Sequence, residues 1–382
     1  MKIKNNIIFF ELIIIFLSVV LIVSYKSTLL EIFSDNGGAD IIFYPIINCI
    51  SQGINHYRSA LDGNSCAGPF SHMGEYLQSI YLILYPFKFL EVSQAKILWG
   101  IINFFLIFLI TFLLCKKFKL DKFSTVILIF FISFSIITRI HLIMGQHALF
   151  ILFFLILPFI FKSKLSFFLS GLSYIKYNIG YTLFLYYIAN KKFKILLISI
   201  LPCVFSWFFY SLLTDKNFIS NILEPFLLML HLEKNPGNKS SLIFLFSFIL
   251  KNEFFIYPFN LIFFIFVSLL LNYFIIIKIS KVNDDLLKLS CLNISALIFM
   301  PHYSHDYIIL IPFIIYSVKN YGKNFILSRV NLLSCIYFFH LQGIKQFLNL
   351  GFDFQYLNIL LLSLLLFFNL KQKKPRISSP GF

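Results

Sequence analysis

Apolar runs of about 15 to 25 residues recur from end to end of this chain of 382 residues, and they constrain its fold more than any other feature. A helix needs about 20 apolar residues to cross a hydrocarbon core of about 30 Å. The composition agrees, because 59% of the residues are hydrophobic and only 13% are charged. Runs such as IINFFLIFLITFLLC lack the alternating polarity of a transmembrane β-barrel. We therefore predict an all-α, polytopic membrane protein.

The predicted membrane spans lie near 7–23, 97–115, 124–138, 147–161, 194–213, 255–279, 286–300, 307–318, 325–341 and 354–370. The first follows Lys2 and Lys4 and is not followed by a small-residue cleavage site, which favours a retained anchor over a cleaved signal peptide. We expect one transmembrane domain, 1–370, with about 10–12 segments. A basic cytoplasmic tail, 371–382, follows it.

Charge gives these spans an orientation. The net charge is +16, and most of the Lys and Arg residues fall in short clusters between apolar runs, such as KKFKLDK and KQKKPR. When these clusters are placed in the cytoplasm, most acids fall on the other side, as the positive-inside rule requires. We therefore expect a multi-pass plasma-membrane protein with both termini cytoplasmic. The positive charge then needs no nucleic acid as a partner.

The stretch 165–189 lies between two basic clusters, KSK and NKKFK, that both read as cytoplasmic. Lys176 and Asn178 lie in its middle, with glycines on either side. Two half-helices that enter the membrane and return would keep both clusters on one side. A single straight span would instead invert every later segment. We favour the hairpin because it leaves KQKKPR in the cytoplasm.

Two long segments are expected on the outer side, 24–96 and 214–253. The first contains apolar residues at helical spacing that are too few to span a bilayer and too apolar for water, which is typical of interfacial helices. They are Tyr76, Ile80, Ile83, Leu84 and Phe87. Cys49 and Cys66 share this loop, and an oxidising compartment would allow them to pair. Their spacing leaves the pairing open.

Ionisable residues near membrane depth are costly, so each needs a reason. The candidates fall in four outer segments: Asp40, Arg139 to His147, Lys176, and the PHYSHD run from 301 to 306. Together they suggest a shared cavity at the outer membrane boundary. A purely structural explanation is weakest for Lys176. A lysine inside an apolar hairpin needs a partner, and an anionic ligand is a natural one.

The other candidates have structural explanations that stay open. Asp40 is equally explained as a solvated loop acid or a helix cap. Arg139 would reach the head groups by snorkelling. Gln146 and His147 would cap the next span. His302, His305 and Asp306 would form a wet turn, or a metal site for which we find no distant partner ligand. We expect no metal.

The order of these motifs resembles glycosyltransferase family 87, which comprises polyprenyl-phosphate-sugar-dependent mannosyltransferases of the GT-C superfamily. The matching residues run from about 36 to 318, and each motif is short. They are Asp40, Tyr44, Gly53 and Tyr57; Tyr76, Pro86, Ala95 and Trp99; Gly145 and Gln146; Gly171, Leu172 and Lys176; Asn238 and Ser240; and Pro301, His302, Asp306 and Tyr307.

The resemblance implies a GT-C-like helical bundle with an inverting hexosyltransferase site on the extracytoplasmic face. The donor would be a mannose-like hexose on polyprenyl phosphate, and the acceptor a hydroxyl of a glycolipid or polysaccharide, with no cofactor. Asp40 would be the general base. The donor phosphate would be bound by Lys176, Arg139, His302 and His305. Sugar or acceptor would be contacted by Tyr44, Gln146, His147 and Asp306.

The alternative function is a transporter or flippase for a lipid-linked or anionic substrate. Such a protein would also bury Lys and Arg among many spans. Its signature would be paired halves with matching broken helices. The sequence shows one broken helix and no second copy, which favours the transferase.

Overall fold

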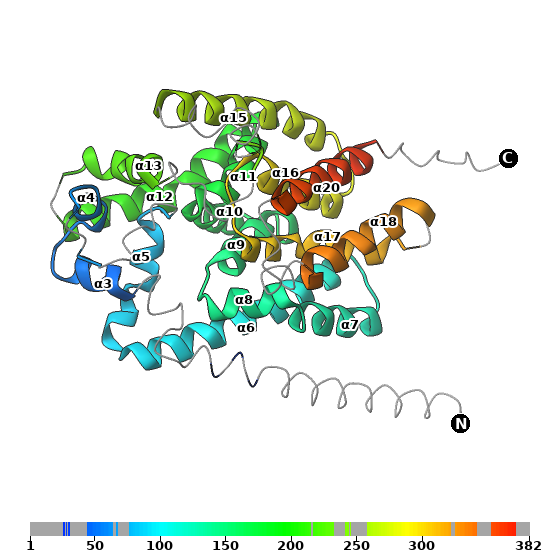
Figure 1. Cartoon of the computed structure of the whole chain (residues 1–382), viewed down its shortest axis with the longest axis horizontal. Helices are drawn as coiled ribbons and strands as arrows, with labels where there is room; N and C mark the ends of the chain where they lie inside the picture. Colours follow the sequence, from blue (N-terminus) through cyan, green and yellow to red (C-terminus); the bar gives the residue numbers. More distant parts are fainter. Residues whose placement is uncertain are drawn as a thin grey trace.

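The structure is a computed structural model, and it describes residues 26, 28, 30, 44–63, 66–67, 76–214, 217–232, 241–243, 245, 258–321, 325–341 and 353–371. Every regular element in these ranges is helical, as predicted (Figure 1). The predicted first span, Asp40 and the basic tail beyond residue 371 lie outside the described residues.

The two predicted outer loops contain short helices. Those of the first loop are α3 (Tyr44–Ser51), α4 (His56–Leu61), α5 (Ser79–Leu84) and η2 (Tyr85–Phe89), and that of the second is α13 (Ser220–Leu232). Of the apolar residues picked out at helical spacing, Ile80, Ile83, Leu84 and Phe87 lie in α5 and η2 and Tyr76 just precedes α5, and four of the five are buried. The helical prediction for this part of the first loop is therefore confirmed.

The remaining helices form the bundle. In chain order they are α6 (Val92–Lys117), α7 (Lys122–Ser133), α8 (Ile136–Ile143), α9 (Ala148–Ile160), α10 (Lys164–Ser170), η3 (Gly171–Ile175), α11 (Tyr177–Ala189), α12 (Phe193–Leu213), α15 (Pro258–Ser280), α16 (Asp285–Phe299), η5 (Ser304–Leu310), α17 (Ile311–Lys319), α18 (Phe325–Ile336), η6 (Tyr337–Leu341) and α20 (Asp353–Leu370).

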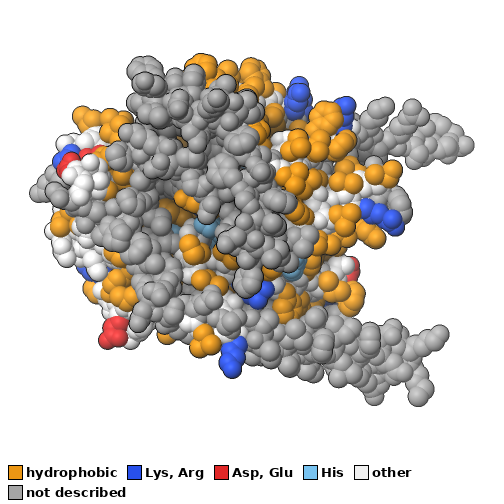
Figure 2. Space-filling view, viewed as in Figure 1, with side chains coloured by type: hydrophobic (Ala, Val, Ile, Leu, Met, Phe, Trp, Pro, Cys, Tyr) orange, Lys and Arg blue, Asp and Glu red, His pale blue; other side chains and the backbone are white. Residues whose placement is uncertain are grey.

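Three of these helices, α6, α12 and α15, are long and apolar enough to cross a membrane. The pair α7 and α8, bent by 54° at its break, would make a fourth span. Their outward faces expose large apolar side chains such as Phe105, Phe209 and Phe263, which suits contact with lipid. Figure 2 shows how much of one face is hydrophobic. A helical membrane protein is thus supported, and the part of the chain that the structure describes holds up to four candidate spans against the predicted 10–12 segments.

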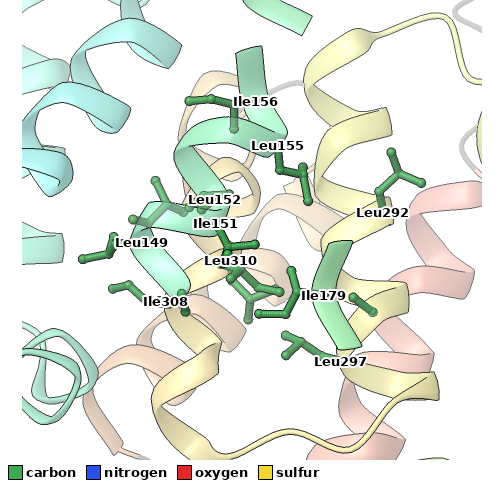
Figure 3. Packing of buried hydrophobic residues seen from close by; sticks show 14 of the residues in the cluster. Leu149, Ile151, Leu152, Leu155, Ile156, Ile179, Leu292, Leu297, Ile308 and Leu310 are labelled. Atoms are coloured by element: carbon green, nitrogen blue, oxygen red, sulfur yellow. The ribbon is translucent and has the colours of Figure 1, made fainter. Parts of the chain in front are cut away.

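Helix α9 lies at the centre of the bundle because its sequence, ALFILFFLILPFI, is apolar all round. Leu149, Leu152 and Leu155 are fully buried on it. Ile179 of α11 and Leu292 of α16 pack in the same cluster (Figure 3). The core therefore joins segments far apart in the chain.

The basic clusters meet at one end of the bundle, called here the basic end. The Lys117 ammonium donates to the Ile160 carbonyl at 2.8 Å, which links the ends of α6 and α9. Lys162 pairs with Asp285 at 3.1 Å, and Lys319 lies 3.8 Å from Asp284. The four clusters from 116 to 122, 162 to 164, 278 to 288 and 319 onward are thereby brought together, as the charge pattern predicted.

The stretch 164–189 doubles back on itself, as the hairpin predicts. Lys162, just before it, pairs with Asp285, and Lys192, just after it, interacts electrostatically with the same carboxylate. Both ends therefore lie at the basic end. A Cβ placed on Gly180 would lie 2.2 Å from the Ser173 carbonyl oxygen, so the two arms touch backbone to backbone.

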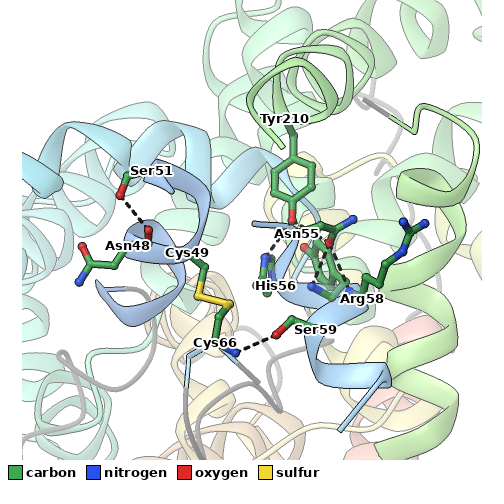
Figure 4. Close-up of a disulfide and its surroundings, with 10 residues drawn as sticks. Asn48, Cys49, Ser51, Asn55, His56, Arg58, Ser59, Cys66 and Tyr210 are labelled. Atoms are coloured by element: carbon green, nitrogen blue, oxygen red, sulfur yellow. Dashed lines mark hydrogen bonds between the residues drawn. A yellow bond between two sulfur atoms is a disulfide. The ribbon is translucent and has the colours of Figure 1, made fainter. Parts of the chain in front are cut away.

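The two outer loops are joined to each other. Cys49 and Cys66 form a disulfide, which answers the question that their spacing left open (Figure 4). The closed loop contains α4, and Arg58 of α4 pairs with Glu224 of α13 at 3.0 Å. Asn55, the N-cap of α4, also donates to the Glu224 carboxylate. The disulfide therefore closes the first loop around α4, and polar contacts alone fix α4 against the second loop.

Replacing Gly180 with Ala should destabilise the protein by about 3 kcal/mol or more, because a backbone carbonyl rather than a flexible side chain must move. Gly63→Ala is the matched control. Gly63 has a positive φ of 75° but nothing within 4 Å of an added Cβ, so it should cost only about 1 kcal/mol. Thermal unfolding in detergent measures both. Equal losses would contradict the close approach of the two arms.

Single cysteines should report the two sides of the membrane. Lys164 is exposed at the basic end, and Ile219 is 77% exposed just before α13. An impermeant maleimide applied to intact cells should label Ile219→Cys and not Lys164→Cys. Labelling of both positions, or of Lys164→Cys alone, would refute the expected orientation. Of the native free cysteines, Cys115, Cys291 and Cys335 are buried and Cys203 is half-buried, so both variants are made in a Cys203→Ser background.

Candidate functional site

A buried ion pair lies in the bundle. The Lys176 ammonium is 2.6 Å from the Asp306 Oδ1 atom, and both side chains are 0% exposed. Removing two charges from water costs several kcal/mol each, and close contact between them offsets part of that cost. The sequence predicted that Lys176 must pair with something, and its partner in this structure is Asp306.

The break between η3 and α11 positions Lys176 at the tip of the hairpin. The Leu77 amide donates to the Ile175 carbonyl at 2.8 Å, so the first loop is bonded to the tip on one side. The Asn178 side-chain amide donates to the Pro301 carbonyl at 2.7 Å on the other. The tip therefore connects the first loop with the PHYSHD run.

The 3-10 helix η5 positions Asp306. The second carboxylate oxygen of Asp306 accepts from the Tyr303 amide at 3.3 Å, and the Asp306 amide donates back to the Tyr303 carbonyl at 3.0 Å. The His305 Nε2 atom lies 3.8 Å from Asp306 Oδ1. The carboxylate thus has neighbours on two sides besides Lys176.

Aromatic and amide groups from the first loop and α9 line the lysine. The Lys176 ammonium lies 5.5 Å from the centroid of the Tyr76 ring, a cation–π distance. The Tyr76 hydroxyl donates to Gln146 at 3.0 Å. The His147 ring packs 4.9 Å from Tyr76 and 5.1 Å from Trp99. Gln146 and His147 therefore lie in the site, as expected.

Two more histidines complete the surroundings of the pair. His141 of α8 interacts electrostatically with His305, Asp306 and Lys176. His302 interacts with Asp306 and Lys176 as well. Within the described ranges, His141 Nδ1 and His302 Nε2 are buried without a hydrogen-bond partner. Such atoms are costly to leave unpaired, so a ligand with donors or acceptors is a natural complement. Figure 2 shows histidine atoms in the middle of one face.

The charge balance indicates which ligand this site suits. His302, His305 and Asp306 have side chains that bind metals. However, the Lys176 ammonium already contacts the carboxylate and would repel a divalent cation there. An anion can contact Lys176 only by displacing the Asp306 carboxylate, which would then need hydrogen bonds from His302 or His305 nearby. The lysine therefore disfavours a metal, and the site admits an anion only in exchange for Asp306.

The other expected site residues lie apart from this pair. The Tyr44 hydroxyl donates to the Leu90 carbonyl at 2.8 Å, which ties α3 to the end of η2. Arg139 is on α8 with His141 but interacts electrostatically with His340 of η6. Asp40 lies outside the described residues. The structure thus joins Lys176, Gln146, His147, His302, His305 and Asp306.

A second polar cluster, between α4, α12 and α13, was missed by the sequence reading. The Tyr210 hydroxyl contacts the His56 Nδ1 atom at 3.0 Å and donates to Asn55 at 3.1 Å. Burial lowers the pKa of His56 to about 3, so the ring is neutral. Asn221 and Glu224, three residues apart in an apolar run, were the available signal, because that spacing places both on one helical face.

Replacing Lys176 with Met should cost about 3–5 kcal/mol, because a buried carboxylate loses its counter-charge. The double variant Lys176→Met, Asp306→Leu removes both charges and should recover most of that loss. Chemical or thermal unfolding in detergent measures all three proteins. A Lys176→Met variant as stable as the wild type, or a double variant less stable than Lys176→Met, would refute the pairing.

Comparisons with known proteins add no relative: no protein-family model, no curated protein and no solved structure matches this chain. The resemblance to glycosyltransferase family 87 therefore rests on the residues quoted for it. The interpretation of its function depends on the residues and geometry of the site.

Proposed function

We propose that this protein is an inverting, membrane-embedded glycosyltransferase that uses a polyprenyl-phosphate-linked hexose as donor and an acceptor hydroxyl on the extracytoplasmic face. The observation that carries the proposal is the fully buried Lys176, which is held at a hairpin tip beside unpaired histidine nitrogens. A cation in an apolar bundle suits a phosphate whose lipid tail arrives from the bilayer.

The chemistry needs one base and one anion site. A carboxylate, for which we propose Asp40, takes the proton of the acceptor hydroxyl as its oxygen attacks the anomeric carbon. The bond from that carbon to the phosphate oxygen breaks, and the electron pair leaves with the polyprenyl phosphate. Lys176 would stabilise the charge that develops on the phosphate, and His302 and His305 would donate hydrogen bonds to it. The attack comes from the face opposite the leaving group, so the configuration inverts.

The location of the pair is consistent with an extracytoplasmic reaction. Lys176 is at the hairpin tip, whereas both hairpin ends lie at the basic end. The tip also bonds to Leu77 of the first loop, and that loop carries the Cys49–Cys66 disulfide. Disulfides persist in oxidising compartments such as the bacterial periplasm or cell surface. These contacts support an outer site.

One observation favours the alternative, a transporter or flippase for an anionic lipid-linked substrate. The centre is built from interrupted elements: α8, which follows the 54° break after α7, the hairpin tip, and the 3-10 helix η5. Transporters build their substrate sites from such broken helices. The sequence predicted only one of these interruptions.

Changing Asp40 to Asn should reduce sugar transfer by at least about 100-fold, because a positioned base contributes roughly 10²–10⁴-fold. The matched control is Asp35→Asn, a change of the same kind five positions earlier in the same loop. Transfer from radiolabelled polyprenyl-phosphate sugar in isolated membranes is the measurement. Asp35→Asn should keep wild-type activity.

Three results would decide against parts of this proposal. Full activity in Asp40→Asn would reject Asp40 as the base. Full activity in the stable double variant Lys176→Met, Asp306→Leu would reject the ion pair as the phosphate site. Movement of the labelled lipid across the membrane by a wild-type protein that transfers no sugar would establish the alternative.

A further inference from the structure

Three lysines surround one carboxylate at the basic end, at the opposite end of the hairpin from Lys176. The two oxygens of Asp285 are shared, one with Lys162 at 3.1 Å and the other with Lys288 at 3.3 Å. Within the described part of the chain, the third lysine, Lys192, makes no ion pair. We call Lys162, Lys192, Lys288 and Asp285 the lysine triad site.

The side chain of Tyr186 holds two of the lysines together. The ammonium groups of Lys192 and Lys288 each lie 5.8 Å from the centroid of its ring. Burial lowers the pKa of Lys192, and the charge of Lys288 lowers it further. The site therefore holds three positive charges and one negative charge, so its net charge is positive.

Apolar side chains lie next to these lysines in the chain. Phe161 precedes Lys162, and Phe193 follows Lys192; they are 55% and 56% exposed, and Leu165 is 65% exposed. Helix α10, which carries Leu165, packs against α9, which ends just before Phe161, and against α12, which begins at Phe193. A cationic group bordered by exposed apolar side chains matches the two parts of a phospholipid, an anionic head group and an acyl chain.

The backbone at Lys162 adopts the left-handed conformation, as it does at Lys119 and Lys191. It has a positive φ of 49°, a conformation that favours glycine and costs a lysine roughly 1 kcal/mol. It follows α9 by two residues, where helices commonly end in glycine. The side chain is 63% exposed, so it can reach a head group.

We propose that the lysine triad site binds an anionic glycerophospholipid, with the phosphate head group between Lys162, Lys192 and Lys288 and an acyl chain along Phe161, Leu165 and Phe193. The lipid head group would supply the negative charge that Asp285 alone does not. This site is independent of the transferase proposal, because it lies at the opposite end of the hairpin from Lys176.

The test is a titration of purified full-length protein in detergent with phosphatidylglycerol or phosphatidylcholine of the same acyl chains, with bound lipid counted by native mass spectrometry. The wild type should prefer phosphatidylglycerol. Lys162→Gly should weaken that binding about fivefold, and Lys192→Gln by a similar factor. Binding of phosphatidylcholine should not change.

The Lys162→Gly variant is chosen because it should fold as well as the wild type. It relieves the positive-φ conformation, so Lys162→Gly should unfold at the same temperature as the wild type or higher. The matched control is Lys119→Gly, which removes the same charge at an exposed position with a φ of 60° just after α6. Lys119→Gly should leave lipid binding unchanged.

Three outcomes would overturn the proposal. One is equal binding of the two lipids by the wild type. Another is an equal loss of phosphatidylglycerol binding in Lys119→Gly and Lys162→Gly, which would indicate general charge attraction. The third is displacement of the lipid by inorganic phosphate alone, which would indicate a free-phosphate site. If Lys162→Gly fails to fold, Lys192→Gln provides the same comparison.

Discussion

The ion pair of Lys176 and Asp306 is the contact on which the middle of this protein depends. A lysine in an apolar bundle is stable only with a counter-charge, and the nearest one comes from a segment 130 residues later in the chain. To bring them together, the chain must reverse at the hairpin tip and place Asp306 on a 3-10 helix next to that tip. The backbone contact between Gly180 and Ser173 lets the hairpin close this tightly.

The bundle has two chemically different ends, and the Lys176–Asp306 pair lies at one of them. At the hairpin tip, charge is buried, balanced and surrounded by histidine and tyrosine rings. At the basic end, lysines outnumber the acids near them, and most of these lysines are exposed although Lys288 is buried. The hydrophobic core around α9 separates the two. A phosphate could therefore be bound at either end for different reasons: exclusion from water at the tip, and an excess of positive charge at the basic end.

The two outer loops are held together by contacts of their own. The disulfide closes the segment that contains α4, and Asn55 and Arg58 of that helix bond to α13. Residues from two distant loops thus behave as one structure over the bundle. For a transferase, such an arrangement would shape the space that an acceptor must enter, next to a tip already bonded to Leu77.

The sequence by itself determined the helical membrane class, the hairpin, the grouping of the basic clusters and many of the described helices, although not the break between α7 and α8. These follow from local patterns, namely apolar run length and the spacing of charge. It also singled out Lys176, Gln146, His147, His302, His305 and Asp306, because polar residues beside apolar runs need a reason. Only the tertiary structure decided that Asp306 is the partner of Lys176, that Arg139 faces His340, and that Cys49 pairs with Cys66. It alone revealed the cluster around Asn55, His56 and Glu224. Pairing between distant segments depends on how helices pack in three dimensions, and no local pattern encodes that packing.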